Sequence, residues 1–360
     1  MNVVILCGGV GTRLWPWGRK NKPKQFFPLI GDQPLVVETY NRFRQNYAVE
    51  QIYFSVTAEL LRPLQKLFPK LPAQQFIVEP SRRDTAPAMG FAAAMLLSRG
   101  PNEPMVFVPA DHFILDAKKY LDCFKAGEVL IKETSKLVDI GIAATFPSTV
   151  LGYTKIGKKV GAKNGVAVYH FAGHTEKPDL ATAKRYLRQG GYLWHGNYYM
   201  WTPARFLEAF KKFSPGHYKI LARIIEALNN KRGREVPELY NKMAKISFDY
   251  AITEKLKPAD VLILKGEFGW SDVGAWDLLH DRLKVQDDEF GNATRGTVIA
   301  VDSKHSVLFS AEKKILAAVG LKDFIVINTP DAILVCPKNR AQDVKMVIKQ
   351  IEEQGLEKFL

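Results

Sequence analysis

Residues 3–16 read VVILCGGVGTRLWP: an apolar run ends in a cluster of glycines, and Arg13 follows the cluster. The aliphatic run predicts a buried β-strand, and the glycines predict a tight turn at its carboxyl end. Because glycine has no side chain, backbone N–H groups at such a turn can approach a phosphate closely. The turn is therefore predicted to cradle phosphate groups with Gly8, Gly9 and Gly11.

Two familiar phosphate-binding motifs do not match this turn. A P-loop needs Gly-Lys-Ser or Gly-Lys-Thr, whereas Gly11 is followed by Thr12 and Arg13. A dinucleotide fingerprint needs a third glycine after two intervening residues, which the sequence lacks. Asp32 lies 21 residues after Gly11, near the spacing of a ribose-binding carboxylate, which leaves a nicotinamide dehydrogenase as an alternative. The cations between these two residues argue against it.

Basic residues follow the glycines directly. The first 31 residues contain no Asp or Glu but carry Arg13, Arg19, Lys20, Lys22 and Lys24. Arg13 offers a planar fork for phosphate oxygens, and Lys24 offers a compact charge. Both are predicted to act in catalysis by stabilising the charge that builds on an α-phosphorus under attack. Lys20 and Lys22 are predicted to be solvated surface residues.

Composition limits the class of protein. The chain has 360 residues, of which 47% are hydrophobic, and a formal net charge of +14. It can therefore bury a large core, and its charge favours anionic partners. A nucleic-acid-binding module is the non-enzyme alternative, but no stacking or helix-in-groove motif supports it, so no nucleic-acid partner is expected.

Membrane association is not expected either, because no apolar run approaches the ~18 residues of a membrane helix. The three cysteines are widely spaced and odd in number, which predicts reduced, buried thiols. The opening residues lack the pattern of a signal peptide, and together these features predict a cytoplasmic location.

The first half of the chain alternates short β-branched runs with amphipathic stretches, which is typical of βαβ units in an α/β fold. The sheet of such units is parallel, and ligands bind beyond the carboxyl ends of its strands. The predicted strands are 3–7, 52–56, 76–78 and 106–108, and the predicted helices are 35–43, 60–68, 86–97 and 120–131.

From about residue 140 the pattern changes to mixed strands at 153–156, 166–171 and 192–201, with a helix at 179–188. After about residue 290 it changes again to short strands at 297–301, 306–309, 315–319, 324–327 and 332–335, with a closing helix from Arg340. We therefore predict two domains, 1–285 and 290–360, the second a small β-rich tail. Packing or oligomerisation is its expected role, so a homodimer is a candidate assembly.

Two aspartates are candidate metal ligands. Asp111 follows the predicted strand 106–108, where a carboxylate suits Mg²⁺ that is shared with substrate phosphates. Asp272 is the best candidate for a second ligand, because glycines and tryptophans surround it in residues 268–276, FGWSDVGAW. A helix N-cap is an equally good interpretation of each aspartate alone.

Two acidic residues are candidates for reading a base. Guanine presents two adjacent donors, N1–H and N2–H, so a carboxylate at Glu79 or Asp84 can accept from both. Capping by Asp84 or Thr85 of the helix at Pro87 is the competing interpretation.

Three further segments carry weak signals. Glu176-Lys177-Pro178 pairs an acceptor with a cation and suits a sugar phosphate, although surface turns often have such a sequence. Asn197 lies among aromatic residues that suit the floor of a sugar site. Asp249 and Glu254 are predicted to lie on an ordinary helix surface.

In this order, the motifs GGxGTRLWP, PKQF, TAPA, PADH, GY, EKP, DYA with EK, and WSDVGxW closely resemble those of the mannose-1-phosphate guanylyltransferases. The resemblance spans roughly residues 2–280. It implies a Rossmann-like nucleotide-diphospho-sugar transferase fold with a mixed central sheet. The tail resembles a short left-handed β-helix.

The resemblance implies the transfer of GMP from GTP to mannose 1-phosphate, with Mg²⁺ as cofactor. A nucleotidyltransferase for another sugar 1-phosphate or another NTP is the alternative. The implied nucleotide-binding residues are Gly8, Gly9, Gly11, Thr12, Glu79, Thr85, Ala86 and Pro87, and the catalytic residues are Arg13, Lys24 and Asp111. Mg²⁺ would bind Asp111 and Asp272, and the sugar phosphate would bind Gly152, Tyr153, Glu176, Lys177 and Asn197.

The sequence departs from the family pattern at two places near the implied sugar site. The family has Trp-Asn-Ser-Gly where this sequence has Trp194-His195-Gly196-Asn197. It has Phe-Val or a similar pair before Glu-Lys-Pro where this sequence has His174-Thr175.

Overall fold

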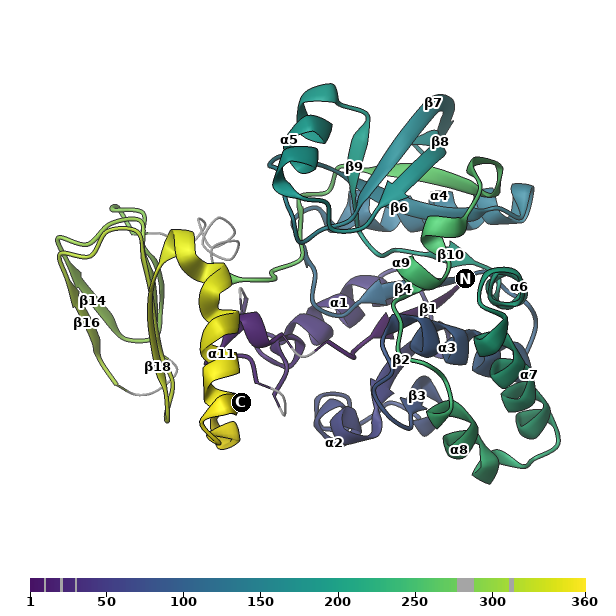
Figure 1. Cartoon of the computed structure of the whole chain (residues 1–360), viewed down its shortest axis with the longest axis horizontal. Helices are drawn as coiled ribbons and strands as arrows, with labels where there is room; N and C mark the ends of the chain where they lie inside the picture. The colour runs from purple at the N-terminus through teal and green to yellow at the C-terminus, as the bar shows by residue number, and fades with distance from the viewer. Residues whose placement is uncertain (10, 20–21, 30, 277–287, 311–313) are drawn as a thin grey trace. The chain divides into compact units, whose positions relative to one another are not determined.

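The structure is a computed structural model that describes residues 1–9, 11–19, 22–29, 31–276, 288–310 and 314–360. Its residues form two compact units (Figure 1). The first unit consists of Met1–Gly8, Thr39–Ala110 and Ile114–Trp270. The second unit consists of Gly9–Glu38, Asp111–Phe113 and Ser271–Leu360. The division predicted from sequence, 1–285 and 290–360, remains a prediction about domains.

The first unit contains a ten-stranded sheet with the strand order β11-β8-β7-β9-β6-β10-β4-β1-β2-β3. Strands β1 to β4 pair in parallel, as continuous apolar strands separated by helices require. They span Asn2–Leu6, Ile52–Thr57, Phe76–Glu79 and Met105–Pro109. Helices α1 to α4 span Leu35–Arg44, Ala58–Leu67, Thr85–Arg99 and Ala117–Thr134. All four predicted strands and helices are confirmed.

The other half of the sheet is mixed, as predicted. Strands β6 to β9 and β11 span Leu137–Ala143, Tyr153–Lys163, Val166–Thr175, Tyr192–His195 and Val261–Gly266. Their pairings run from β6 through β9, β7, β8 and β11 and return to β6, so these five strands close on themselves. Only the β6–β11 pair is parallel among them.

The single strand predicted at 192–201 is wrong. Two strands replace it, β9 (Tyr192–His195) and β10 (Met200–Trp201), and β10 is antiparallel to β4. Asn197 interrupts the run with a φ of 58°, a left-handed conformation that strand residues do not adopt. The break turns the chain directly after His195.

Five further helices lie in the first unit. They are α5 (Leu180–Gln189), α6 (Pro203–Phe213), α7 (Pro215–Asn229), α8 (Val236–Asn241) and α9 (Phe248–Ala251). Helix α3 packs closely against α6 and α7 at Gly90, where a Cβ would lie 2.8 Å from Leu221 Cδ1 and 3.1 Å from the Phe210 ring. This contact lies within the main core of the unit.

The tail forms most of the second unit, and its successive strands stack in parallel as in a β-helix. One layer consists of β13 (Ala293–Arg295), β15 (Val307–Ser310) and β17 (Phe324–Asn328), with β18 (Ile333–Pro337) antiparallel at its edge. The other layer consists of β14 (Val298–Val301) and β16 (Leu316–Val319). Five of these strands match the prediction, and β13 was not predicted. Helix α11 spans Val344–Glu353 and begins four residues after the predicted Arg340.

The residues after the glycine turn lie in the core of this second unit. Leu14 and Trp15 pack with Trp276 and with the inward side chains of the tail strands. Trp15 Nε1 donates to the carbonyl oxygen of Phe359 (2.8 Å), and Trp276 Nε1 donates to the carbonyl oxygen of Trp15 (3.1 Å). These contacts fix the chain between the glycines and Lys24.

All three cysteines lie in the described part of the chain, and none of them forms a disulfide. Cys7 and Cys123 are buried as predicted, whereas Cys336 is only half-buried. Among the described residues, every helix is too short or too polar to cross a lipid bilayer.

Candidate active site

Lys24 joins three of the predicted motifs within the second unit. It begins a short 3₁₀ helix, Lys24–Phe26, and is only 7% exposed. Its Nζ lies 2.9 Å from Asp111 Oδ2 and donates to the backbone oxygens of Asp272 (2.7 Å) and Val273 (3.2 Å). Residues separated by up to 249 positions therefore meet at one ammonium group.

The glycine turn lies directly against this group. Gly11 has a φ of 62°, and a Cβ at this position would lie 2.6 Å from Lys24 Cγ, so both conformation and space require glycine. A Cβ at Gly9 would lie 3.8 Å from Asp111 Oδ2. Gln25 Nε2 donates to the Gly9 carbonyl oxygen (3.0 Å) and ties the turn to the 3₁₀ helix.

Asp111 is an ionised carboxylate rather than a helix cap. Burial alone would raise the pKa of Asp111, but the charges of Lys24 and His112 lower it overall, so the carboxylate is ionised. Asp111 lies in a turn after β4, and the N-cap of α4 is Asp116 instead. Asp272 Oδ1 accepts from the Gly274 N–H (3.2 Å) within its own loop.

The basic residues around the turn differ in their surroundings. Arg13 is half-buried in the 3₁₀ helix Thr12–Leu14. Arg19 forms a two-pronged ion pair with Asp331, with N–O distances of 2.8 and 2.5 Å. Distant acidic residues thus offset part of the positive field predicted from the acid-free start of the chain. Lys22 is exposed as predicted; Val10, Lys20 and the side chain of Thr12 lie outside the described residues.

Glu79, in the first unit, accepts hydrogen bonds from neighbouring hydroxyl groups. It is 4% exposed, and its two oxygens accept from Ser55 Oγ and Tyr240 OH, each at 2.9 Å. Burial raises the pKa of Glu79 despite these hydrogen bonds. Recognition of a base by Glu79 is therefore the least supported of the predicted roles.

The segment after Glu79 forms the N-terminus of α3. Asp84 is the N-cap, and its side chain accepts from the Thr85 N–H (2.7 Å), so the competing capping interpretation is confirmed for Asp84. Thr85 Oγ1 accepts from the Phe248 N–H (2.8 Å), and the Ala86 N–H donates to the Ile246 oxygen (3.1 Å). Of the predicted nucleotide-binding residues here, Thr85 is exposed, whereas Ala86 and Pro87 are buried.

Gly152 and Glu176 are brought together in the first unit. A Cβ on Gly152 would lie 2.5 Å from Glu176 Oε2. Burial alone would raise the pKa of Glu176, but contacts with His174 and Lys177 lower it to about 2. Tyr153 is buried, and its hydroxyl accepts a hydrogen bond from the Ser148 N–H (2.9 Å).

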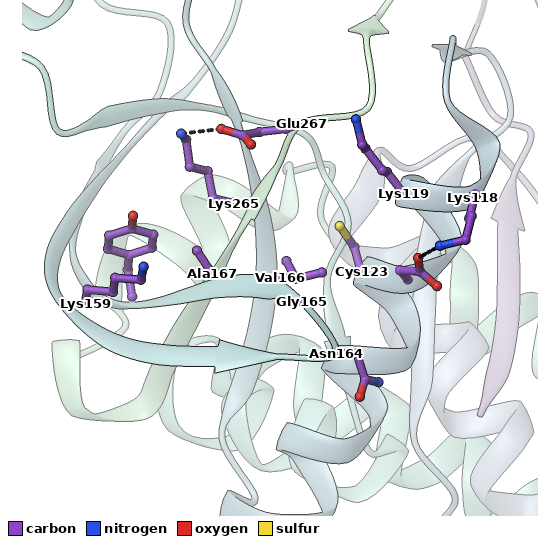
Figure 2. Close-up of a pocket in the computed structure, with 12 residues that line it drawn as sticks. Lys118, Lys119, Cys123, Lys159, Asn164, Gly165, Val166, Ala167, Lys265 and Glu267 are labelled. Carbon is purple, nitrogen blue, oxygen red and sulfur yellow. Dashed lines mark hydrogen bonds and ion pairs between the residues drawn. The ribbon is translucent and has the colours of Figure 1, made fainter.

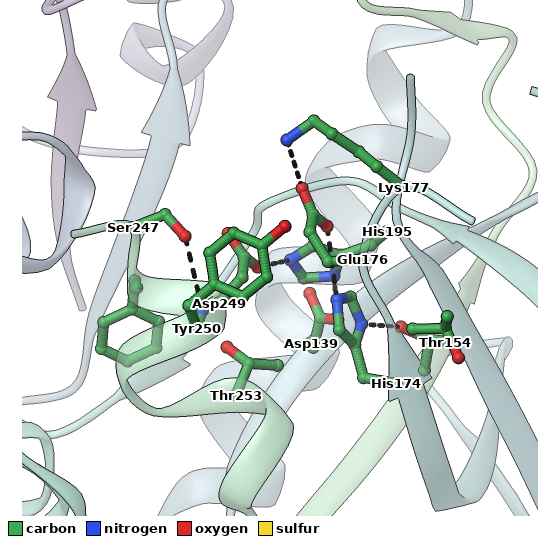
Figure 3. A network of polar contacts seen from close by, with 12 residues as sticks. Asp139, Thr154, His174, Glu176, Lys177, His195, Ser247, Asp249, Tyr250 and Thr253 are labelled. Carbon is green, nitrogen blue, oxygen red and sulfur yellow. Dashed lines mark hydrogen bonds and ion pairs between the residues drawn. The ribbon is translucent and has the colours of Figure 1, made fainter. Parts of the chain in front are cut away.

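Behind Glu176 lies a network of charged groups that sequence reasoning missed (Figure 3). His195, at the end of β9, has Nδ1 2.8 Å from Asp139 Oδ2 and Nε2 3.5 Å from Asp249 Oδ1. Burial alone would lower the pKa of His195, but Asp139, Asp249 and Glu176 raise it to about 9. The signal in the sequence was the departure at Trp194–Asn197 from the family pattern.

Asp249 belongs to this network, so its prediction as a helix-surface residue is wrong. It is 7% exposed and accepts from Tyr199 OH at 2.5 Å. Glu254 lies in a separate 3₁₀ helix, Thr253–Lys255. The DYA motif, rather than the helical spacing, was the informative signal for Asp249.

The last two predicted sugar residues lie in turns. Lys177 has a φ of 44° and forms an ion pair with Glu176. Asn197 is exposed, in the loop between β9 and β10. The structure therefore brings Gly152, Glu176 and Lys177 together and leaves Asn197 on the surface.

A separate pocket of about 500 Å³ lies beside α4 and β8 in the first unit (Figure 2). None of the described residues that line it belongs to the predicted site. Lys118 pairs with Asp122, and Lys265 pairs with Glu267, so two of its lysines are already partly neutralised. We do not include this pocket in the candidate site.

The comparisons with known proteins agree with the fold. The family model described as Nucleotidyl transferase matches residues 2–288. A second model, described as MannoseP isomerase/GMP-like beta-helix domain, matches residues 296–351. The chain therefore belongs to the nucleotidyl transferase family.

Individual relatives narrow the resemblance. The mannose-1-phosphate guanylyltransferase of Escherichia coli (strain K12) is 34% identical, over 98% of this chain and 73% of its own length. The xanthan biosynthesis protein XanB of Xanthomonas campestris is 36% identical over the same shares. A crystal structure of a protein named mannose-1-phosphate geranyltransferase, from Thermus thermophilus, matches with a TM-score of 0.86 at 29% identity and covers 98% of this chain and 99% of that one. The resemblance and the fold class predicted from the motifs are confirmed.

Proposed function

We propose that the chain transfers GMP from GTP to mannose 1-phosphate and releases pyrophosphate. Relatives named mannose-1-phosphate guanylyltransferase support this activity. The observation that carries the proposal is the meeting of Lys24 Nζ with the Asp111 carboxylate and the Asp272 carbonyl oxygen, beside the glycine turn. It joins a cation, two acidic residues and a phosphate-binding turn from separate motifs.

In the proposed reaction, a phosphate oxygen of mannose 1-phosphate attacks the α-phosphorus of GTP, and the bond from this phosphorus to pyrophosphate breaks. The attacking oxygen is already anionic, so no side chain has to remove a proton. The protein has to position two anionic substrates and offset their repulsion. We assign this task to Lys24 and Arg13, with Gly8, Gly9, Gly11 and Thr12 around the triphosphate.

Asp111 and Asp272 fit a magnesium ion by the chemistry of their donor atoms. Both offer carboxylate oxygens, and Mg²⁺ is usually held by one or two carboxylates together with substrate phosphates. The lowered pKa of Asp111 keeps its carboxylate ionised and able to act as a ligand. Bound there, Mg²⁺ would supply Lewis acidity toward the phosphate oxygens.

The sugar phosphate and the base are assigned to the first unit. Gly152, Tyr153, Glu176, Lys177 and Asn197 are proposed to bind mannose 1-phosphate, with Lys177 as the cation for its phosphate. Glu79, Thr85, Ala86 and Pro87 are proposed to lie beside the base. His195 stands where the family has asparagine, and this departure favours the alternative of another sugar 1-phosphate.

A substrate panel tests the proposal. Release of pyrophosphate is measured with GTP, ATP or UTP, each with mannose 1-phosphate or glucose 1-phosphate, in the presence of Mg²⁺. We expect the highest turnover with GTP and mannose 1-phosphate. Equal turnover with UTP would overturn guanine recognition, and faster turnover with glucose 1-phosphate would favour the alternative.

Two further parts of the proposal concern the protein in the cell. We propose a cytoplasmic location, consistent with three cysteines outside disulfides. A homodimer remains a prediction, which light scattering of the purified chain would test.

A further inference from the structure

Four side chains from three segments of the first unit converge on one point (Figure 3). His174 lies in β8, Glu176 follows that strand, His195 ends β9, and Asp249 lies in α9. The ligand atoms of His174, Glu176 and Asp249 all lie within 4.8 Å of one another. His195 Nε2 lies 3.5 Å from Asp249 Oδ1.

In both histidines Nδ1 has a hydrogen-bond partner, whereas Nε2 faces a carboxylate without making a hydrogen bond. His195 Nδ1 lies 2.8 Å from Asp139 Oδ2, and His174 Nδ1 lies 3.5 Å from Thr154 Oγ1. Neither Nε2 atom makes a hydrogen bond to any residue that the structure describes. The distance of 3.4 Å between His174 Nε2 and Glu176 Oε2 is that of an ion pair without hydrogen-bond geometry.

These nitrogens are sealed from water. The side chains of His174 and His195 are 0% and 2% exposed. A buried polar atom without a hydrogen bond lowers stability. A ligand that binds imidazole nitrogen would remove this cost at both rings.

We propose that His174, His195, Glu176 and Asp249 bind a divalent transition-metal ion of the zinc class. Imidazole nitrogens with carboxylate oxygens form a typical donor set for Zn²⁺ and for Co²⁺ or Ni²⁺, whereas Mg²⁺ prefers oxygen donors alone. A histidine that ligates a metal commonly gives its other ring N–H to a carboxylate, as His195 is placed to do toward Asp139.

Distances and charges agree with this assignment. Two ligands at ~2.0–2.2 Å from one tetrahedral ion lie about 3.5 Å apart, so the atoms now within 4.8 Å need to approach by about 1 Å. Asp139, Glu176 and Asp249 face His195, and Lys177 is the other cation in contact with Glu176. A divalent ion bound at His195 Nε2 would displace the proton there to solvent and supply two positive charges in its place.

Metal content tests the proposal without substrates, so its outcome is separate from that of the proposed transferase activity. The full chain is stripped with a chelator, incubated with Zn²⁺ and desalted, and zinc is measured by mass spectrometry. We expect about one zinc ion per chain in the wild type. We expect at least a ~10-fold weaker affinity in His174→Gln and His195→Asn, measured by calorimetry. Co²⁺ in place of zinc should give visible absorption bands that both variants lose.

Two control variants make the test specific. His170→Gln changes an exposed histidine on the same strand as His174, and Asp111→Asn removes a proposed magnesium ligand from the second unit. Both should retain wild-type zinc. The proposal would be overturned if the wild type bound no zinc, or if all four variants bound zinc equally. Loss of zinc in Asp111→Asn would also overturn it. If His195→Asn unfolds in circular dichroism, His174→Gln decides, because its Nε2 has no hydrogen bond to lose.

Discussion

Lys24 in the second unit and His195 in the first unit are both buried cations, but their partners differ. Among the residues that the structure describes, Lys24 pairs with one carboxylate, that of Asp111, and donates to two backbone oxygens. His195 faces the carboxylates of Asp139 and Asp249, and Glu176 acts on it as well. Lys24 is therefore paired with one described carboxylate, whereas three carboxylates act on His195.

Exposure differs in the same direction. The Lys24 and Asp111 side chains are 9% and 21% exposed, so water or a phosphate can still reach this pair. The His195 and Asp139 side chains are only 2% and 5% exposed. A pair open to solvent can exchange partners at low cost, whereas a sealed pair holds its geometry. The comparison thus separates a cation suited to bind an incoming anion from a buried histidine that carboxylates hold in place.

Replacing Lys24 should have the largest effect. Lys24→Ala should lower turnover by about 10³-fold, because the variant loses a positive charge placed for the transition state. Pyrophosphate release at saturating substrates measures this loss. Lys22→Ala, two residues earlier and exposed, is the matched control and should stay near wild type. Turnover of Lys24→Ala within tenfold of the wild type would remove Lys24 from the catalytic group.

Asp111→Asn should come next, with a loss of about 10²-fold in turnover and a higher Mg²⁺ concentration for half-maximal activity. The amide keeps the shape of the side chain but lacks the charge that attracts the ion. A Mg²⁺ titration of the rate measures both effects. Asp116→Asn is the control, since Asp116 caps α4 and forms an exposed ion pair with Lys119, and asparagine is an equally good cap. An unchanged Mg²⁺ requirement in Asp111→Asn would contradict the assignment.

Tyr199→Phe tests the network around Asp249 and His195 through the stability of the protein. Tyr199 OH donates to Asp249 Oδ1 (2.5 Å) and lies 2.8 Å from Thr253 Oγ1. Its loss should lower the free energy of unfolding by about 1–3 kcal/mol, measured by urea denaturation, because a buried carboxylate loses a donor. Tyr250→Phe, at an exposed neighbour of Asp249, should change it by less than about 0.5 kcal/mol. Equal effects of the two substitutions would mean that Asp249 does not depend on Tyr199.

The same comparison shows what could be predicted from the sequence. Lys24, Asp111 and Asp272 each stand in a motif where a strand ends or a loop is pinned, and the carboxyl ends of parallel strands meet at one edge of a sheet. Asp331 as the partner of Arg19 could not be predicted, because it is separated by 312 residues and joined only by the folding of the tail.

The network of His174, His195 and Asp249 could not be predicted from the sequence for a different reason. His174 and His195 meet only because β7 pairs with both β8 and β9, and the register of these antiparallel strands is set by packing rather than by local sequence. The helix-surface interpretation of Asp249 failed because spacing along a helix does not say which face is covered. Asn197 shows the converse case: its left-handed φ breaks a run of β-forming residues that indicated one strand.

The smallest effect is expected at Glu79, a buried carboxylate whose hydrogen-bond donors are hydroxyl groups. Burial raises the pKa of Glu79, so the native state holds the Glu79 proton more tightly than the unfolded chain does. As the pH rises from the ordinary value of Glu79 through its raised native value, the unfolded chain loses this proton first, and the wild type loses stability. Glu79→Gln cannot ionise and should escape this loss.

The free energy of unfolding of Glu79→Gln, relative to that of the wild type, should therefore increase between acidic and neutral pH. The expected increase is on the order of 1 kcal/mol, the size of one hydrogen bond. Urea denaturation at several pH values measures it, with Glu103→Gln, at an exposed glutamate, as the control. A decrease of this relative free energy over the same pH range would mean that the native state favours the ionised form of Glu79. In that case a nearby cation such as Arg82 would outweigh burial, and Glu79 would resemble Asp111 rather than stand apart from it.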